Sequence, residues 1–408
     1  MLECDQTHTT LSTVFREEAG KLVGALMRIL GNFEVAEEVV QDALLMALER
    51  WPIEGIPERP GAWLMTVARN RALDQLRREA RYREKLVALE HAGHVEAPQR
   101  DDRLRLMFLC CHPALSRESQ VALTLRAVCG FTTAEIAHAL LASEAAVARR
   151  ITRARQKIVQ AGIPYRLPRD EELDERLGEV LSVLYLMFNE GYLTSGGNLP
   201  ARRDLAEDAA WLTAYVTRLY PREPEALGLL ALMRLHVARV EARFDPAGEL
   251  ILLAQQDRSH WNRQMIGDAI AMIERAAALK RPGPYQVQAA LAACHAEAAS
   301  WEATDWAQIL VLYDFLLCML PSPVVRLNRA VALRYVAGPE AALAEVEKLA
   351  GDLAGYHLFH TIRGELLLEL GQREQAQAAD LRALMLTENS AERSLLKLRL
   401  GSLETPRA

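Results

Sequence analysis

The chain has 408 residues, half of them hydrophobic and a quarter charged, a composition typical of two to three folded domains and too apolar for a disordered protein. No stretch approaches the ~20 apolar residues of a membrane span, and the N-terminus lacks the apolar run of a signal peptide, so we expect a cytoplasmic protein. The net charge of −6 is unevenly divided, with 23 basic and 21 acidic residues up to residue 166 but 25 and 33 beyond it.

Almost the whole chain is predicted to be helical, because runs of Ala, Leu, Glu and Arg dominate and the breaks fall at Pro or Gly. The helices expected in the first part span residues 11–30, 34–50, 61–82, 102–112, 116–128, 133–140 and 144–161. Those expected beyond it span residues 171–188, 201–219, 224–241, 263–279, 284–299, 305–319, 323–337, 339–350, 356–370 and 372–386. We therefore predict an all-α protein with two small helical modules (10–85 and 101–162), a linker (86–100) and a large helical domain (170–408).

The helix expected over residues 34–50 has an acidic face. Its apolar positions, which can face the core of the module, are Val35, Val39, Leu44 and Leu48. Its polar positions form an acidic, hydrogen-bonding surface made of Glu37, Glu38, Gln41 and Asp42. Such a surface repels DNA and suits a protein partner, although an ordinary solvated face is the alternative.

The next segment, residues 61–85, is basic, with seven Lys or Arg against three acidic residues. Its arginines are typical of phosphate contacts, and those of interest here are Arg69, Arg71, Arg77 and Arg78.

Residues 131–161 predict a helix-turn-helix. A short helix led by Thr is followed by Ser143, which is well placed to cap a second helix. One stripe of that helix is apolar and is made of Val147, Ile151, Ala154 and Ile158. A different face carries the basic residues Arg149, Arg150, Arg153 and Lys157. A basic second helix after a short turn suits the major groove of DNA, and a solvated charged helix is the alternative.

The last domain shows signs of a repeat. Gly338 and Gly371 are 33 residues apart, and each ends one helix and precedes a second, Ala-rich helix. This spacing is close to the tetratricopeptide period, in which helix pairs stack because none can bury its apolar face alone. A non-repeating helical domain is the alternative.

Three segments, in order along the chain, resemble bacterial extracytoplasmic-function (ECF) sigma factors: AEEVVQDALLMALERW (36–51), PGAWLMTVARNRALDQLRR (60–78), and GFTTAEIA (130–137) with SEAAVARRITRARQKI (143–158). A second resemblance, to an ECF subgroup with a tetratricopeptide-like C-terminal extension, is carried by FNEGY (188–192), DRSHW (257–261), GPYQ (283–286) and SPVVRLNRA (322–330).

The resemblance implies roles for these segments. The helix over 34–50 would bind the RNA polymerase clamp, and the helix over 60–78 would open and read the −10 promoter element. Asn70 and Arg71 would hold the separated non-template strand, and the acidic linker would follow the RNA path. In the helix over 143–158, Glu144, Arg149 and Arg153 would lie nearest to the bases of the −35 element. Arginine can pair with guanine through two hydrogen bonds, each such pair adding about 1–3 kcal/mol of discrimination.

The leading interpretation is a sigma factor that binds core RNA polymerase and promoter DNA and is controlled by its own C-terminal domain. A stand-alone helix-turn-helix regulator with a C-terminal sensor is the alternative. No catalytic motif is found, and adjacent Cys110, Cys111 and His112 are wrongly spaced for a metal, so we expect no enzyme activity, cofactor or metal. The charge asymmetry adds the hypothesis that the acidic C-terminal domain contacts the basic helices and masks them.

Overall fold

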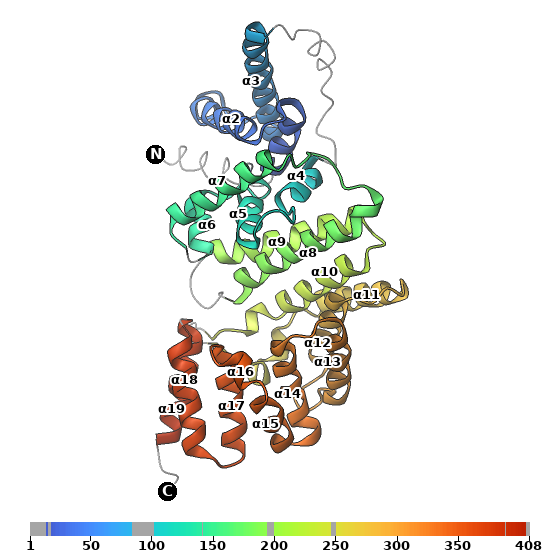
Figure 1. The fold of residues 1–408 in the computed structure, drawn as a ribbon, viewed down its shortest axis with the longest axis vertical. Helices are drawn as coiled ribbons and strands as arrows, with labels where there is room; N and C mark the ends of the chain where they lie inside the picture. Colours follow the sequence, from blue (N-terminus) through green and yellow to red (C-terminus); the bar gives the residue numbers. More distant parts are fainter. Residues whose placement is uncertain are drawn as a thin grey trace. The chain divides into compact units, whose positions relative to one another are not determined.

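We analysed a computed structural model, which describes residue 14 and residues 18–83, 102–140, 142–193, 200–245, 250–387 and 389–404 (Figure 1). In this part of the chain the protein is all-α, as predicted, and the strand-like pairing is limited to one bridge between Phe244 and Leu250. The helices form two compact units. Unit 1 contains the residues up to Glu190 together with Asp204–Asp208, and unit 2 contains Gly191–Arg203 and the residues from Ala209 onward.

Unit 1 holds the two small modules. The N-terminal module consists of a helix over residues 18–30, α2 (Phe33–Glu54) and α3 (Pro60–Arg83). The helix-turn-helix module consists of α4 (Asp102–Cys110), α5 (Arg117–Ala127), α6 (Thr133–Ala139) and α7 (Glu144–Gln160). The long helix α8 (Asp170–Leu193) follows, and the linker predicted over 86–100 lies outside the described residues.

Polar side chains fix where these helices begin. The Asn32 carboxamide oxygen accepts a hydrogen bond from the Glu34 N–H (2.9 Å) at the start of α2. At α6, Thr132 and Glu135 exchange bonds, with the Glu135 carboxylate 2.7 Å from the Thr132 N–H, which forms a capping box. The Ser143 hydroxyl accepts from the Ala146 N–H (3.2 Å), so the predicted cap of α7 is confirmed.

The two modules of unit 1 pack directly against each other. Gly24 makes this approach close, because a Cβ at that position would lie 2.7 Å from the Asp102 carbonyl oxygen. The Tyr165 hydroxyl lies 2.8 Å from the Gly24 carbonyl oxygen and 3.0 Å from that of Asp102. The buried Asp102 carboxylate pairs with Arg28 and Arg105, both at 3.0 Å. The helix over 18–30 is thus joined to the first turn of α4.

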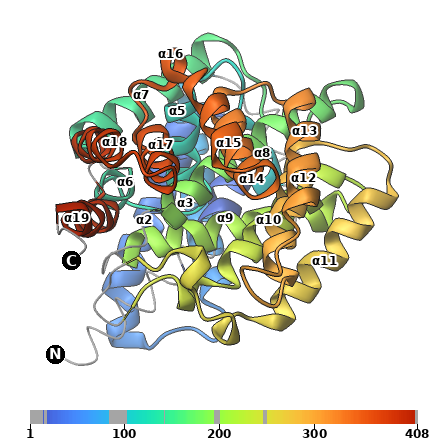
Figure 2. The ribbon, with the colours of Figure 1, turned by 90° about the horizontal axis from the view of Figure 1, so that it is seen from below.

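Unit 2 is an array of helices. Its elements are α10 (Pro224–Val237), η3 (Val240–Ala242), η4 (Leu253–Gln255), η5 (Arg258–His260), α11 (Arg263–Ala278), α12 (Pro284–Glu297), α13 (Trp306–Met319), α14 (Pro323–Ala337), α15 (Pro339–Glu347), α16 (Ala350–Leu353), α17 (His357–Glu369), α18 (Arg373–Leu386) and α19 (Ser390–Glu404). The helix α9 (Pro200–Leu219) contributes residues to both units. Successive helices contact one another, and α17, α18 and α19 lie side by side in that order (Figure 2).

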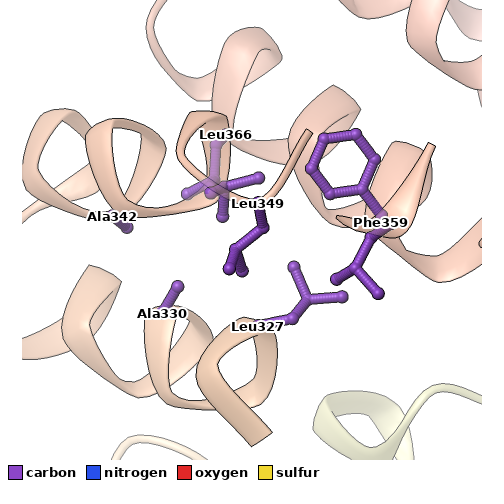
Figure 3. Packing of buried hydrophobic residues seen from close by; sticks show 8 residues of the cluster. Leu327, Ala330, Ala342, Leu349, Phe359 and Leu366 are labelled. Atoms are coloured by element: carbon purple, nitrogen blue, oxygen red, sulfur yellow. The ribbon is translucent and has the colours of Figure 1, made fainter. Parts of the chain in front are cut away.

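The helix pairs predicted around Gly338 and Gly371 are present. Both glycines have positive φ, +90° and +76°, which lets the chain turn sharply between α14 and α15 and between α17 and α18. The side chains of Leu327, Leu349 and Phe359 meet in the core between these helices (Figure 3). Stacked pairs therefore bury their apolar faces against their neighbours.

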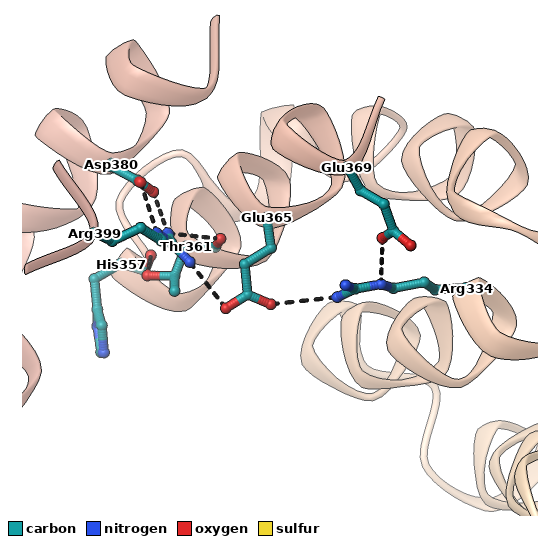
Figure 4. A network of polar contacts seen from close by, with 7 residues as sticks. All are labelled: Arg334, His357, Thr361, Glu365, Glu369, Asp380 and Arg399. Atoms are coloured by element: carbon teal, nitrogen blue, oxygen red, sulfur yellow. Dashed lines mark hydrogen bonds and ion pairs between the residues drawn. The ribbon is translucent and has the colours of Figure 1, made fainter. Parts of the chain in front are cut away.

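A buried polar network joins the last three helices. The Arg399 guanidinium pairs with Asp380, whose side chain is 1% exposed, and lies 2.9 Å from Glu365 (Figure 4). Arg334 extends the network, with its Nε 2.6 Å from Glu369 (Figure 4). Gly364 leaves room for the Asp380 side chain, because a Cβ at residue 364 would lie 2.4 Å from an Asp380 carboxylate oxygen.

The structure corrects the expected core positions of α2. The buried positions of α2 are Phe33, Ala36, Glu37, Val39, Val40, Ala43, Ala47 and Trp51, so Val35, Leu44 and Leu48 are only half-buried and not the centre of the core. The division into compact units falls within α8, after Glu190. In the first half of α8, Arg117 pairs with Glu179 at 2.6 Å, which joins this helix to the helix-turn-helix module.

Candidate polymerase-binding and promoter-binding surfaces

The second helix of the helix-turn-helix, α7, separates its apolar and basic residues as predicted. Its apolar stripe is fully or nearly buried, at 0% exposed for Val147, 5% for Ile151, 1% for Ala154 and 6% for Ile158. Arg149, Arg153 and Lys157 are exposed on a different face, with Arg150 half-buried beside them and Glu144 exposed at the N-terminus. The module thus has a fixed helix whose free face is positively charged.

On α3, the predicted DNA-binding residues differ in their surroundings. Asn70 is exposed, Arg69 is half-buried, and Arg77 pairs with Asp74 at 3.2 Å one turn away. Arg71 pairs with Asp42 of α2. Arg78 lies on α3, but its side chain is outside the described part of the chain.

Two predicted polymerase-binding residues of α2, Glu38 and Gln41, are exposed. Asp42 is half-buried, because its carboxylate contacts the Arg71 guanidinium. Each of these two side chains keeps about 40% of its surface exposed, so the pair contributes only about 0–1 kcal/mol and is easily exchanged for another partner.

Glu37 is not part of the exposed acidic surface, contrary to the prediction. The residue is 8% exposed, and its carboxylate accepts a hydrogen bond from Arg126 Nε (2.6 Å) and another from Arg155 Nη2. Arg126 belongs to α5 and Arg155 belongs to α7. The Arg155 guanidinium also lies 5.3 Å from the centroid of the Phe33 ring. Burial and two arginines therefore tie Glu37 to the helix-turn-helix module.

Comparison with known proteins identifies both modules. Residues 14–82 match the family Sigma-70 region 2, and residues 105–158 match Sigma-70, region 4. The chain is 32% identical over 146 residues to the ECF RNA polymerase sigma factor SigL of Mycobacterium tuberculosis, covering 35% of this chain and 82% of SigL. The chain belongs to the ECF RNA polymerase sigma factors.

Further similarities include one that covers nearly the whole chain. An uncharacterized protein of Rhizobium meliloti is 45% identical over 392 residues, which is 93% of each chain. A probable ECF sigma factor of Mycobacterium tuberculosis, SigI, is 30% identical over 38% of this chain and 57% of its own. Residues 176–277 match a family of unknown function, and no solved structure matches the chain.

As a sigma factor, the protein takes part in transcription initiation, and region 2 and region 4 correspond to the N-terminal and helix-turn-helix modules. In the described residues, no helix combines the length and apolar character needed to cross a membrane. Cys110 and Cys111 are buried in region 4, and burial raises the pKa of the Cys111 thiol to about 12.

Sequence reasoning missed the contact between the two regions, although part of its signal was present. Glu37 is four residues after Phe33 and three before Val40, so it lies on the buried face of α2. Arg155 is likewise four residues after Ile151, beside the apolar stripe of α7. Helical spacing could have predicted that both charged side chains are at least partly buried. It could not have predicted that Glu37 and Arg155 form an ion pair with each other.

Proposed function

We propose that this sigma factor binds core RNA polymerase through the exposed face of α2 and reads the promoter through α3 and α7. Glu38 and Gln41 would contact the polymerase, joined by Asp42 once Arg71 turns to DNA. Asn70 and Arg71 would hold the opened −10 element, with Arg69, Arg77 and Arg78 on phosphates. Glu144, Arg149 and Arg153 would face the −35 bases, and Arg150 and Lys157 the flanking phosphates.

The observation that carries this proposal is the segregation of charge onto free faces of buried helices. The α7 stripe of Arg149, Arg153 and Lys157 is exposed, while the opposite stripe is fixed in the core. A positive helix face of this kind attracts DNA at long range and contacts phosphates at short range. The exposed Glu38 carboxylate instead repels DNA, and the neutral Gln41 beside it can form hydrogen bonds with a protein surface.

We further infer that the described arrangement of regions 2 and 4 precedes polymerase binding. While Glu37 pairs with Arg126 and Arg155, region 4 covers the side of α2 next to the proposed docking face. The two regions would separate when they reach the two promoter elements, and Glu37 would then join the docking surface. The closed arrangement would lower the fraction of the free chain that is ready to bind.

The C-terminal helical domain is proposed to control this activity. Support comes from its stacked helix pairs, a type of structure that offers extended binding surfaces, and from its excess of acidic residues. Contact between this domain and the basic helices remains a hypothesis. A truncation that tests it should end at Leu193, because α8 is joined to region 4 by the pair between Arg117 and Glu179.

Affinity for core polymerase tests the docking proposal. The full chain should bind core polymerase, and the double variant Glu38→Ala/Gln41→Ala should bind at least tenfold more weakly, since interface residues at the centre of a contact cost above about 1 kcal/mol each. The matched control is Glu49→Ala, an exposed acidic residue of the same helix. A stand-alone regulator, the alternative, would show no affinity for core polymerase at all.

A further inference from the structure

Unit 2 contains a small cavity where the C-terminal ends of α10 and α12 meet the segment around η4 and η5. Its volume is about 80 Å³, several times the ~10–15 Å³ needed to admit a single water molecule. The polar residues that line it are His236, Arg239, Trp261 and His295. The cavity is therefore large enough for a small molecule and has polar groups to orient it.

Two of these lining residues have buried polar atoms without partners. Trp261 is 3% exposed, and its Nε1–H has no hydrogen-bond acceptor in the part of the chain that the structure describes. His295 Nδ1 is likewise buried and unpaired. A buried donor without an acceptor costs stability, so such atoms at a cavity wall indicate that something else fills their bonding capacity.

The other two lining residues leave the site rich in donors. Arg239 Nη2 lies 3.4 Å from His236 Nδ1. Because a guanidinium only donates, His236 accepts at Nδ1 and carries its hydrogen on Nε2. Arg239 has four further N–H groups, and none has a partner among the described residues.

The cavity is also positively charged. Arg258 donates to the carbonyl oxygens of His295 and Ala298, both at 2.6 Å, and Arg263 lies 3.3 Å from that of Ala296. Among the described residues Arg258 has one acidic neighbour that acts on it, because burial and Arg263 lower the Arg258 pKa while the Glu302 carboxylate raises it. Burial and the charges of Arg239 and Arg258 lower the pKa of His295 to about 4, so the imidazole is neutral at pH 7.

We propose that this cavity binds a small organic carboxylate, with its oxygens on Arg239 and the Trp261 indole N–H and its aliphatic part against Leu235, Leu253 and Ala292. A cation is disfavoured by the arginines, and a guanidinium matches the two oxygens of a carboxylate. Inorganic phosphate fits less well, because its oxygens would face the apolar wall. The proposal does not depend on how the sigma regions bind polymerase or DNA.

The test is a saturation-transfer NMR titration of the full chain with acetate, propionate and butyrate, at constant ionic strength. Propionamide is the neutral counterpart of propionate, and inorganic phosphate tests the anion class. The variants are Arg239→Gln and Trp261→Phe, with Arg275→Gln as the control, since Arg275 is exposed on α11. Far-UV circular dichroism and thermal midpoints establish that each variant is folded.

We expect saturable binding of at least one carboxylate and none of propionamide. Arg239→Gln should weaken it roughly ten- to hundredfold and Trp261→Phe roughly three- to tenfold, while Arg275→Gln leaves it unchanged. If Arg239→Gln does not fold, Trp261→Phe decides. The proposal is overturned if no carboxylate binds, if propionamide or phosphate binds equally well, or if the folded cavity variants bind as tightly as the unaltered chain.

Discussion

Replacing Glu37 by Gln removes the carboxylate that pairs with Arg126 and Arg155 across the contact of regions 2 and 4. Breaking a buried ion pair typically costs about 3–5 kcal/mol. The two arginine side chains are 20% and 19% exposed, so part of their hydration remains. We therefore expect Glu37→Gln to destabilise the closed arrangement of regions 2 and 4 by about 2–4 kcal/mol. At 1.4 kcal/mol per factor of ten, the closed arrangement should become roughly 30- to 1000-fold less favoured.

The distance between two spin labels measures this shift. Leu45→Cys on α2 and Val159→Cys on α7 place labels on side chains that are 58% and 73% exposed. Cys4, Cys294 and Cys318 are first replaced by Ser, while the thiols of region 4 are buried and react slowly.

The unaltered chain should give one short, narrow distance distribution between the two labels. Glu37→Gln should add a long, broad one, because region 4 is released while each region keeps its own core. Glu49→Gln, an exposed carboxylate on the same helix, is the control and should change nothing. Identical distributions for Glu37→Gln and the unaltered chain would refute the idea that this carboxylate holds the regions together.

Three further predictions concern charge, the C-terminal network and pH. Lys157→Gln should reduce the salt dependence of promoter binding by the polymerase complex by about 0.9 in log–log slope, and an unchanged slope would remove Lys157 from the phosphate contacts. Arg399→Ala should lower the stability of unit 2 in urea by about 3–4 kcal/mol because Asp380 stays buried without its partner, and a loss below 1 kcal/mol would contradict the network's role. His295 should contribute a fall of about 3 kcal/mol in stability as the pH drops from 6.5 to 4, because it takes up a proton in the unfolded but not the folded state, and His236, whose pKa burial also lowers, adds to the fall. His295→Asn should flatten this slope while the exposed His260→Asn does not, and equal slopes would show that His295 does not titrate as described.

Local structure was largely predictable from the sequence because local chemistry determines it. Ser143 caps α7 as expected, and the alternation of apolar and basic residues along that helix predicted which face is buried. Gly338 and Gly371 marked helix ends because a positive φ suits glycine. The final helix α19 was missed, although Asn389 marks its start by accepting hydrogen bonds from the Ala391 and Glu392 N–H groups.

Contacts between distant segments were not predictable in the same way. An acidic helix pattern shows that Glu37 is charged but not which arginine lies opposite, and Arg126 and Arg155 are 89 and 118 residues away. The same holds for the carboxylate cavity, since Arg239, Trp261 and His295 come from three separate segments. Such groupings arise from packing, which a single sequence encodes only indirectly.

Run-off transcription with purified core polymerase tests most directly whether the chain directs initiation. Templates are selected from genomic DNA, and their −35 and −10 elements are then altered one at a time. We predict transcripts that start at one position, require both elements and are lost with the Glu38→Ala/Gln41→Ala variant. Transcripts that start at random positions would contradict the account. So would an amount of transcript that is the same with core polymerase alone as with core polymerase and the added chain.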